Sequence, residues 1–423
     1  MDRQLIGFAK ADITPPFSVK LAGYGSVRPS TGTHDPIYAR CLVYRDDAKT
    51  TVIFALDLIA ADDALCARIK NELKVLSIDE KSVNICAIHS HSTPMGVSES
   101  RHGALHGFEE EFGESDERVI SLVLKGCQAA CKEALACLDE YTLSRFECEV
   151  VGAGSNRTDP NLQGDNLLTG FVFEQKNGKR CLLYNYSCHP TVLAPDNLEI
   201  SADLPYAVEE RLKQYDEVIF INGSSGDIST RYNRSGFGFA EVERFGKIIA
   251  DCIDEAEKHS EECENKEITQ QFVPIELKTR QPLPLDEAEK NVERYKAQYE
   301  AAQKAGAGRT ELRANMAFLE GANANLMYTK HCEGAKSYTL DCRILSIGDK
   351  DICCCPVELY SELSNRLKKN GTLFASYANG YFLYLADKKA HDNHNYEACS
   401  SPFAYGEGEH LIDEFEKELK KKA

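Results

Sequence analysis

Two histidines stand one residue apart in the segment "AIHSHSTPMG", which runs from Ala87 to Gly96. The preceding run "SVNICAIHS" is apolar and contains several β-branched residues, which predicts a buried strand. His89 and His91 then fall at the carboxyl end of that strand, where α/β folds tend to bind ligands. Residues at i and i+2 of a strand point to the same side, so the pair predicts a metal ligand with an acid–base group beside it. The alternative is that one histidine packs in the core and the other caps the turn.

A third histidine occurs in the same kind of context. His189, in "YNYSCHPTVLAP", also ends an apolar strand and is also followed by a proline. Zinc sites draw at least three side chains from separate segments of a chain, so this repetition favours a metal site. The alternative is coincidence, with each histidine doing no more than ending its strand.

A loop of small residues follows another apolar strand, in "VIFINGSSGDISTRYN". Its Gly-Ser-Ser-Gly sequence leads directly into Asp227 and Ser229. Small residues allow the backbone to approach a substrate closely, and the N–H groups of such a loop can hold an oxyanion. The same pattern is also a common exit from a strand into a loop.

The charge balance of the chain excludes some classes of partner. The 423 residues carry 49 basic and 67 acidic side chains, a net charge of −18, and no basic stripe interrupts this balance. Such a surface repels nucleic acid and anionic membranes. We therefore expect a small-molecule substrate, no nucleic acid partner and no stable membrane association. The sequence leaves the oligomeric state open.

The cysteines and the N-terminal residues bear on the compartment. The start "MDRQLIGFAKADITPP" lacks the basic-then-apolar order of a signal peptide, and no apolar run approaches the roughly 20 residues that span a bilayer. The 17 cysteines are an odd number, and many lie within apolar periodic patterns, where a thiol acts as a small hydrophobic group. We expect reduced thiols and a cytoplasmic location.

Strands and helices alternate along the chain, which predicts an α/β fold in one domain spanning residues 1–423. We expect strands over 37–46, 50–60, 82–90, 142–154, 166–175, 179–188, 217–223, 337–348, 351–357 and 372–386. We expect helices over 62–76, 115–140, 204–214, 239–259 and 359–369, with a further helix at the C-terminus. Residues from about 283 to 330 are charged and Ala-rich, and "AGAGR" breaks their helical pattern, which predicts an inserted helical hairpin.

Seven segments together resemble one known family, the neutral ceramidases, which hydrolyse the N-acyl bond of ceramide with zinc. They are, in order, "GFAKADITPP", "GYG", "HSHSTPMG", "CHPT", "NGSSGDIS", "PVELYSEL" and "YANGYFLYLADKKAHDNHNYEACS". The resemblance runs from about residue 6 to about residue 405. It implies the fold of that catalytic domain, with mixed β-sheets flanked by helices, and a hydrolase that acts on C–N bonds.

The resemblance also implies a set of ligands for zinc (Zn²⁺). His89 and His189 match two ligating histidines, Glu358 in "PVE" matches a ligating glutamate, and Tyr384, the second tyrosine of "NGYFLY", matches a ligating tyrosine. Two imidazoles, a carboxylate and a phenol or water satisfy Zn²⁺, whose charge brings the pKa of bound water to about 7. The alternatives are that Tyr384 is a core aromatic and Glu358 a carboxylate at a helix N-terminus.

Four further residues match positions that surround the metal in the family. These are His91, Arg157 in "GSNRT", Ser229, and Tyr396 in "NYEACS". His91 would take a proton from a zinc-bound water, and Arg157 with a tyrosine hydroxyl would neutralise charge on the carbonyl oxygen. Tyr396 would line the site, unless it is a core aromatic. We expect Ser229 to position the substrate and not to attack it, because a nucleophilic serine needs a base within about 3 Å.

The chain departs from the family at several points. It has Ser-Thr-Pro at 92–94 where the family has Ser-Gly-Pro, and Ser-Thr-Arg at 229–231 where the family has Ser-Pro-Asn. The added arginine would bring positive charge to the mouth of the pocket. The chain also has no tryptophan, the residue favoured at membrane interfaces, and we expect neither the immunoglobulin-like domain of the family nor an export signal. These departures predict that the substrate is a smaller, polar amide or ester, either neutral or anionic, and not membrane ceramide.

Three classes of function follow from this site. The first is a zinc-dependent hydrolase of C–N or C–O bonds, for which one metal with an open position is required. The second is lactone opening or phosphoester cleavage; two metals about 3.5–4 Å apart would favour phosphoester chemistry. The third is a metal-binding protein without activity, for which the site would be closed. The sequence does not name the substrate.

Overall fold

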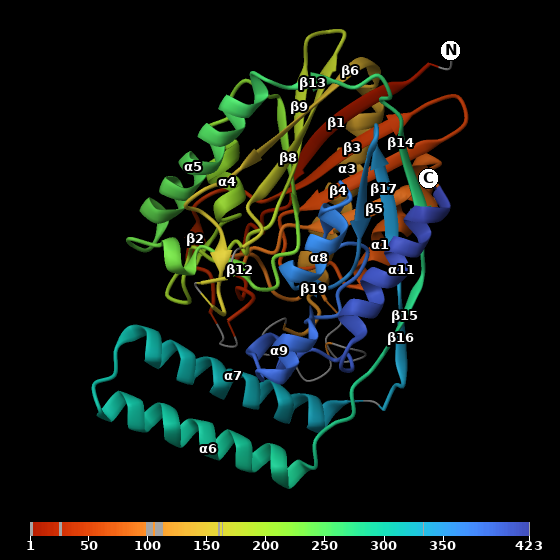
Figure 1. Ribbon diagram of the computed structural model, residues 1–423. Helices are drawn as coiled ribbons and strands as arrows, with labels where there is room; N and C mark the ends of the chain where they lie inside the picture. Colours follow the sequence, from red (N-terminus) through yellow and green to blue (C-terminus); the bar gives the residue numbers. More distant parts are fainter. Residues whose placement is uncertain are drawn as a thin grey trace.

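The computed structural model describes residues 3–24, 28–98, 105, 113–159, 161–162, 164–332 and 334–422, without the side chains of 309 and 310. The last glycine of "GYG" lies outside these ranges. Two β-sheets pack face to face at the centre, and helices cover both outer faces (Figure 1). The structure confirms the α/β fold of mixed sheets flanked by helices that the sequence predicts.

The larger sheet has nine strands in the described residues, in the order β11-β9-β8-β6-β1-β3-β4-β5 with β13 paired to β6. It is mixed, since β9 pairs with β11 and β4 with β5 in parallel, while the remaining neighbours are antiparallel. The strands are β1 (Leu5–Asp12), β3 (Tyr38–Arg45), β4 (Thr50–Leu56), β5 (Val83–Ala87), β6 (Asp139–Glu149), β8 (Leu167–Gln175), β9 (Arg180–Tyr186), β11 (Glu217–Asn222) and β13 (Glu261–Glu262).

Both faces of this sheet are buried, and alternate residues of a strand enter different cores. Cys41 and Val43 of β3 face the helical layer, whereas Leu42 between them faces the second sheet. Gly7 of β1 lets helix α3 lie close, because a Cβ there would be 2.0 Å from the Ala134 carbonyl oxygen. The helices of this layer are α1 (Asp63–Glu72), α3 (Glu117–Ala136), α4 (Leu204–Glu209) and α5 (Phe239–Glu257).

The smaller sheet packs against the face of the larger sheet that its helices leave open, and its own outer face is covered by a second layer of helices. Leu345 and Ile352 share a core with the larger sheet, and Phe374 on the opposite face packs with Phe415. The strands run in the order β14 (Ile268–Phe272), β17 (Arg343–Ile347), β18 (Lys350–Cys354) and β20 (Leu373–Ala375). The covering helices are α8 (Ser361–Lys368) and α11 (Glu407–Lys422).

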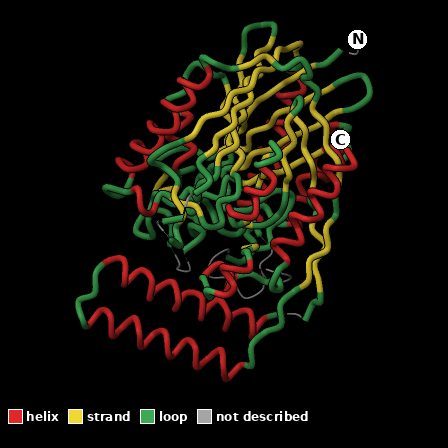
Figure 2. The backbone as a smooth tube through the Cα atoms, in the orientation of Figure 1, coloured by secondary structure: helices red, strands yellow, loops and turns green. Residues whose placement is uncertain are grey.

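The predicted helical hairpin is confirmed and stands at one end of the molecule (Figures 1 and 2). Its helices are α6 (Leu285–Lys304) and α7 (Arg309–His331), and the ring of Tyr295 stacks on that of Phe318 between them. Strands β15 (Ile275–Lys278) and β16 (Ser337–Leu340) pair at its base. Helix α7 contacts α10 (Tyr396–Ser400), so the hairpin reaches the segment that holds one of the predicted site residues.

Short elements join these layers where the strands of the larger sheet end, in the loop-rich middle of Figure 2. No helix in the described ranges is long and apolar enough to cross a bilayer. The short elements are the strand pairs β2 (Gly32–Thr33) with β10 (Glu199–Ile200), β7 (Ser155–Asn156) with β12 (Ile228–Ser229) and β19 (Glu358–Leu359) with β21 (Tyr384–Leu385), and helix α9 (Lys388–Asp392).

The strand predicted over 372–386 was wrong for most of its length. Only Leu373–Ala375 continues the sheet, and an irregular segment follows in which Tyr377, Asn379 and Leu383 have positive φ angles. The run is apolar and aromatic because it is buried, not because it alternates between two faces of a sheet. Its tyrosines are used in the site described next.

Candidate metal centre

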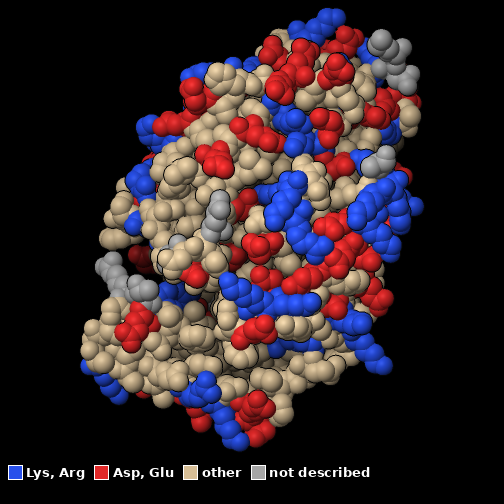
Figure 3. Space-filling model, viewed as in Figure 1, with Lys and Arg blue, Asp and Glu red and all other residues tan. Residues whose placement is uncertain are grey.

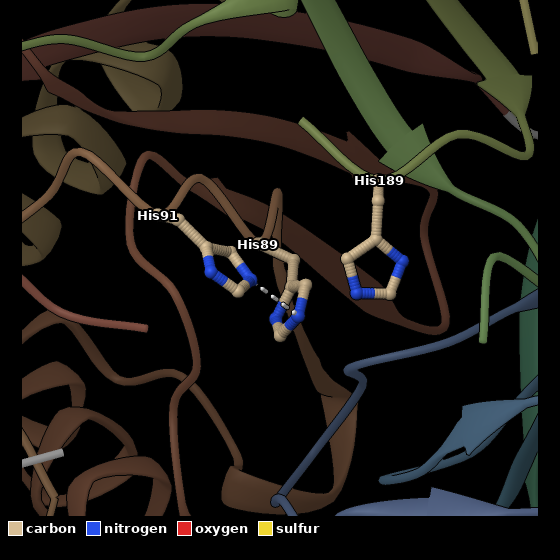
Figure 4. A group of neighbouring side chains, drawn as sticks. All are labelled: His89, His91 and His189. Carbon is tan, nitrogen blue, oxygen red and sulfur yellow. Dashed lines mark hydrogen bonds between the residues drawn. The ribbon is translucent and has the colours of Figure 1, made fainter. Parts of the chain in front are cut away.

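His89 and His91 lie just beyond the end of β5, and their rings meet. Nε2 of His89 is 3.3 Å from Nε2 of His91 (Figure 4). Strand alternation is not the reason, because β5 ends at Ala87 and His89 has a φ of 71°. The His89 amide donates to the carbonyl of Leu58, which fixes this unusual backbone conformation. Non-glycine residues with positive φ are uncommon and occur often at functional sites.

His189 approaches the same point from β9. Its backbone N–H donates to the Ile228 carbonyl at 2.9 Å, and it forms a bridge with Ser229 of β12. The ligand atoms of His89, His91 and His189 all lie within 4.8 Å of one another, and Figure 4 shows the three rings turned toward each other. The structure therefore brings together all three histidines that the sequence singles out.

Backbone carbonyls fix the tautomer of each ring. In each case Nδ1 faces a carbonyl oxygen, namely Ile59 at 2.7 Å from His89, Gly23 at 2.8 Å from His91 and Ser225 at 2.6 Å from His189. A carbonyl only accepts hydrogen bonds, so Nδ1 carries a proton, and in the neutral ring Nε2 then presents a lone pair. Burial, with the neighbouring His89 and His189, holds the pKa of His91 well below its usual value, which keeps the ring neutral. Three lone pairs thus converge.

A buried carboxylate completes the group. Oε2 of Glu358 is 3.3 Å from Nε2 of His89 and 3.1 Å from Nε2 of His189. Both carboxylate oxygens accept hydrogen bonds from tyrosine hydroxyls, those of Tyr381 and Tyr377, as expected of an ionised group. Nε2 of His189 is buried and has no hydrogen-bond partner with acceptable geometry in the described part of the chain. Lone pairs that face a carboxylate at these distances repel one another unless a cation lies between them.

The spacing suits zinc. Ligands about 2.0–2.1 Å from a tetrahedral Zn²⁺ are separated from each other by about 3.3 Å. The carboxylate of Glu358 lies 3.3 Å from Nε2 of His89 and 3.1 Å from Nε2 of His189, which are the predicted ligands. Neutral imidazoles and a carboxylate are also the donors that Zn²⁺ takes in catalytic sites. The residues present therefore fit the ion.

Three hydroxyl groups around Glu358 were missed by the sequence analysis. The hydroxyls of Tyr381 and Tyr377 donate to the two carboxylate oxygens at 2.5 and 3.2 Å, and the hydroxyl of Ser225 lies 2.8 Å from that of Tyr377. The ring of Tyr377 also stacks on His89, with centroids 4.1 Å apart. Hydrogen bonds of this kind orient metal ligands. The available signal was the aromatic run 372–386, which was assigned to a strand.

Tyr384 lies beside Glu358, because the two residues are partners in the parallel pairing of β19 and β21. Its hydroxyl accepts a hydrogen bond from Nη2 of Arg157 at 3.0 Å, and its ring packs edge-on against Tyr396, with centroids 5.7 Å apart. Both tyrosines therefore lie in the site region. The roles of Tyr384 as a metal ligand and of Tyr396 as a substrate contact both stay predictions.

Arg157 is held by a buried carboxylate that the sequence analysis did not identify. Its Nε lies 2.9 Å from Oε1 of Glu397, whose other oxygen accepts from the Tyr360 hydroxyl at 3.0 Å. Burial would lower the pKa of Arg157, but Tyr384 and Glu397 raise it well above its usual value, so the guanidinium is charged. Glu397 directly follows Tyr396 in the sequence, which was the available signal.

Ser229 lies next to His189 in the backbone pairing, but no described side-chain base hydrogen-bonds its hydroxyl. Its hydroxyl accepts from the Arg231 amide at 3.3 Å, and its carbonyl accepts from the Ser155 hydroxyl at 3.2 Å. Within the described residues no histidine or carboxylate hydrogen-bonds the Ser229 hydroxyl. The small residues before it are required by packing, since a Cβ on Gly226 would lie 2.7 Å from the Glu358 carbonyl oxygen.

Comparison with known proteins bears on these features. A family described as neutral/alkaline non-lysosomal ceramidase, N-terminal, matches residues 4–330. The solved structure of neutral ceramidase from Pseudomonas aeruginosa superposes with a TM-score of 0.76 at 18% identity, covering 98% of this chain and 74% of that one. A structure described as a ceramidase complexed with C2 gives a TM-score of 0.73, with 18% identity and the same coverage. A search of curated proteins found no match. At these identities the structural likeness shows the fold alone.

Proposed function

The chain belongs to the neutral/alkaline non-lysosomal ceramidase family, and on that premise we propose that it is a zinc-dependent hydrolase of a small, polar N-acyl compound. One observation carries the proposal: the unprotonated Nε2 atoms of His89 and His189 face the carboxylate of Glu358 in a buried site. Such a donor set suits a resident cation.

His89, His189 and Glu358 would hold the zinc, with Tyr384 as a fourth side chain. When bound there, Zn²⁺ supplies a Lewis acid that lowers the pKa of water and polarises a carbonyl group. The hydroxyls of Tyr377 and Tyr381 orient the carboxylate of Glu358, and the backbone carbonyls of Ile59 and Ser225 orient the two rings. His91 lies at the edge of this group, 3.3 Å from His89.

In the proposed reaction a water molecule attacks the carbonyl carbon of the amide. Nε2 of His91 is free to accept the water proton, because Nδ1 is engaged by Gly23. The same nitrogen then gives a proton to the leaving nitrogen as the C–N bond breaks. The products are a carboxylic acid, which ionises at neutral pH, and an amine, so all atoms of the water are accounted for.

Arg157 and Ser229 would act on the substrate without forming a bond to it. The guanidinium of Arg157, held by Glu397 and donating to the Tyr384 hydroxyl, offers positive charge to the oxygen that becomes negative during attack. Ser229 lies beside the predicted ligand His189 and would position the substrate by a hydrogen bond. The absence of a base at its hydroxyl within the described residues supports attack by water.

We further propose a cytoplasmic location and a soluble substrate. All 17 cysteines are free in the structure, which supports a reducing compartment. The net charge of −18 disfavours contact with anionic membranes.

The test is hydrolysis by the zinc-loaded protein of a panel of N-acyl compounds with short and long acyl chains and with neutral, anionic and cationic amine portions. Release of the free amine is measured by mass spectrometry, with matched esters, lactones and phosphoesters as further arms. Cleavage of at least one amide, lost after chelation and in His189→Ala, supports the proposal. Cleavage of the phosphoester arm alone, or of no compound in the panel, counts against it.

A further inference from the structure

A second charged group lies at the edge of the candidate centre. Arg231 is two residues beyond Ser229, and its backbone N–H donates to the Ser229 hydroxyl. Its side chain turns back to the site, where Nη1 donates to the carbonyl of Arg157 at 2.9 Å. Arg157 in turn contacts the Tyr384 hydroxyl. The Arg231 guanidinium is thus attached to the same scaffold that carries the predicted catalytic groups.

Arg231 has no carboxylate partner among the described residues. The contrast is with Arg157, whose charge is balanced by Glu397 at 2.9 Å. The side chain of Arg231 is only partly exposed, and burial together with the charges of Arg157 and Arg313 lowers its pKa to about 10. The group therefore stays positive at neutral pH. Glu397, which pairs with Arg157, acts on Arg231 only from a distance, and no described carboxylate forms an ion pair with it. A half-buried cation without a partner is costly unless another ligand supplies the charge.

The inserted hairpin also carries a cation that acts on Arg231. Arg313 belongs to α7, and its positive charge contributes to the lowered pKa of Arg231. It pairs with Glu320 on the same helix at 2.9 Å, and both of these side chains are more than one-third exposed. Figure 3 shows the molecule hollowed between the hairpin and the body. A substrate that enters between these two parts would meet positive charge in a chain that is otherwise strongly acidic.

We infer that Arg231 binds an anionic group of the substrate, so that the substrate class is an N-acyl compound with a carboxylate on its amine portion. The inference rests on the proposed function, and it names the substrate class of that same site. N-acyl amino acids are the simplest compounds with this chemistry. A neutral N-acyl compound would leave the Arg231 charge without a partner.

The planar guanidinium suits this role. It presents N–H donors in a fixed fork that matches the two oxygens of a carboxylate. One Nη of Arg231 is occupied by the Arg157 carbonyl, which fixes the side chain and leaves its other donors for a ligand. Hydrogen bonds between charged groups in such sites change affinity by about 10- to 100-fold.

The experiment measures binding and not turnover. The probes are two ketomethylene analogues of an N-acylglycine, in which a methylene group replaces the amide nitrogen so that neither is cleaved. One ends in a carboxylate and the other in a neutral carboxamide. Their affinities for the zinc-loaded wild-type protein are measured by calorimetry. We expect the carboxylate to bind about 10- to 100-fold more tightly than the carboxamide.

Three variants locate the effect. Arg231→Gln should bring the two affinities within about threefold of each other, and Arg231→Lys should restore part of the preference because it keeps the charge but loses the fork. Arg211→Gln is the matched control, since it removes the same charge from the exposed pair with Glu243 and should keep the full preference. Unchanged binding of the carboxamide to Arg231→Gln shows that the site is still folded. An equal affinity of wild type for both probes, or a preference that survives Arg231→Gln, overturns the inference.

The same design separates this inference from the proposed function. If the analogues show the charge preference but no N-acyl compound is hydrolysed, the anion site stands and the hydrolase proposal fails. If neutral and anionic amides are hydrolysed with equal kcat/KM and bound equally, the hydrolase proposal stands and the anion site fails.

Discussion

Oε2 of Glu358 lies 3.1 Å from Nε2 of His189; it accepts a hydrogen bond from the Tyr377 hydroxyl, and neither atom carries a proton when the ring is neutral with its proton on Nδ1. The Nδ1 proton of the ring is committed to Ser225, and the pKa of His189 is lowered to about 3 by burial and by the charge of Arg157. Two electron-rich atoms at this distance in a buried site need a cation between them. A metal ion meets that need without a change of tautomer.

We therefore expect the purified protein to contain about one zinc per chain. The variant His189→Ala removes one of the predicted zinc ligands. Its zinc content after dialysis should therefore fall to below about one-tenth of the wild-type amount. The measurement is elemental analysis by mass spectrometry together with protein concentration.

The control for the zinc measurement is His259→Ala, at an exposed histidine just after α5, which should retain the full zinc content. Circular dichroism of both variants checks that the fold is kept. Full zinc occupancy in His189→Ala would show that the ligand set is wrong.

Regular elements could be predicted from the sequence because their burial is periodic. The strand over 38–45 was predicted to within one residue at each end, while the strand over 50–56 and the helix over 117–136 were predicted four residues too long at their C-terminal ends; each shows an apolar period that matches its structure. The hairpin was predicted for the same reason, with "AGAGR" marking its turn. In these parts local pattern and tertiary packing agree.

The parts of the site that depend on irregular backbone could not be predicted in this way. The segment around Tyr377 and Tyr381 is as buried as a strand, but its tyrosines are held by hydrogen bonds to Glu358. The positive φ of His89 likewise depends on its bond to Leu58, which is distant in sequence. The resemblance of motifs gave the residue identities, whereas the contacts between them required the fold.

The pair of Arg157 and Glu397 gives a second prediction, which separates stability from activity. Arg157→Met should destabilise the protein by about 3–5 kcal/mol, because it leaves the buried carboxylate of Glu397 without its partner. It should also lower kcat/KM by about 10²-fold or more, since the positive charge near the carbonyl oxygen is lost. Urea unfolding and steady-state kinetics measure the two effects.

The double variant Arg157→Met with Glu397→Gln separates the effect on stability from the effect on activity. The neutral amide can still accept the Tyr360 hydroxyl, so much of the stability should return while activity stays low. Recovery of activity in the double variant would mean that Arg157 acts only through the fold.

A buried ionic cluster away from the histidines gives a pH-dependent prediction. Arg40 contacts Asp57, Glu209 and Glu217, and Lys10 contacts Glu209, so three carboxylates share two cations. Burial raises the pKa of Glu217 to about 7, against the opposing charges of Arg40 and Lys10. The folded protein therefore retains a proton here that the unfolded chain has lost.

The sign of the effect follows from the proton count. Between about pH 4.3, the pKa of an unfolded glutamate, and about pH 7, the folded state binds more protons, so the free energy of unfolding falls as the pH rises. We expect Glu217 to contribute a loss on the order of 2–3 kcal/mol between pH 5 and pH 8. In Glu217→Gln this part of the slope should disappear, as measured by urea unfolding at pH 5, 6, 7 and 8.

The matched control for the pH series is Glu174→Gln, at a mostly exposed carboxylate on β8 that pairs with Arg180 at 3.5 Å. It should keep the wild-type slope. A slope that is the same in wild type and Glu217→Gln would mean that Glu217 is ionised throughout this range.

The last prediction decides between attack by water and attack by Ser229. Nε2 of His91 is unprotonated and faces the centre, whereas the Ser229 hydroxyl accepts a hydrogen bond from a backbone amide and contacts no side-chain base within the described residues. His91→Ala should therefore lower kcat by about 10²-fold or more with zinc retained, the usual size of a general-base loss. Ser229→Ala should be milder. Rapid-quench kinetics with an activated N-acyl substrate should show no burst of amine in either protein, because attack by water forms no acyl-enzyme. A burst in wild type that vanishes in Ser229→Ala, or a covalent adduct trapped on Ser229, would establish the serine as the nucleophile.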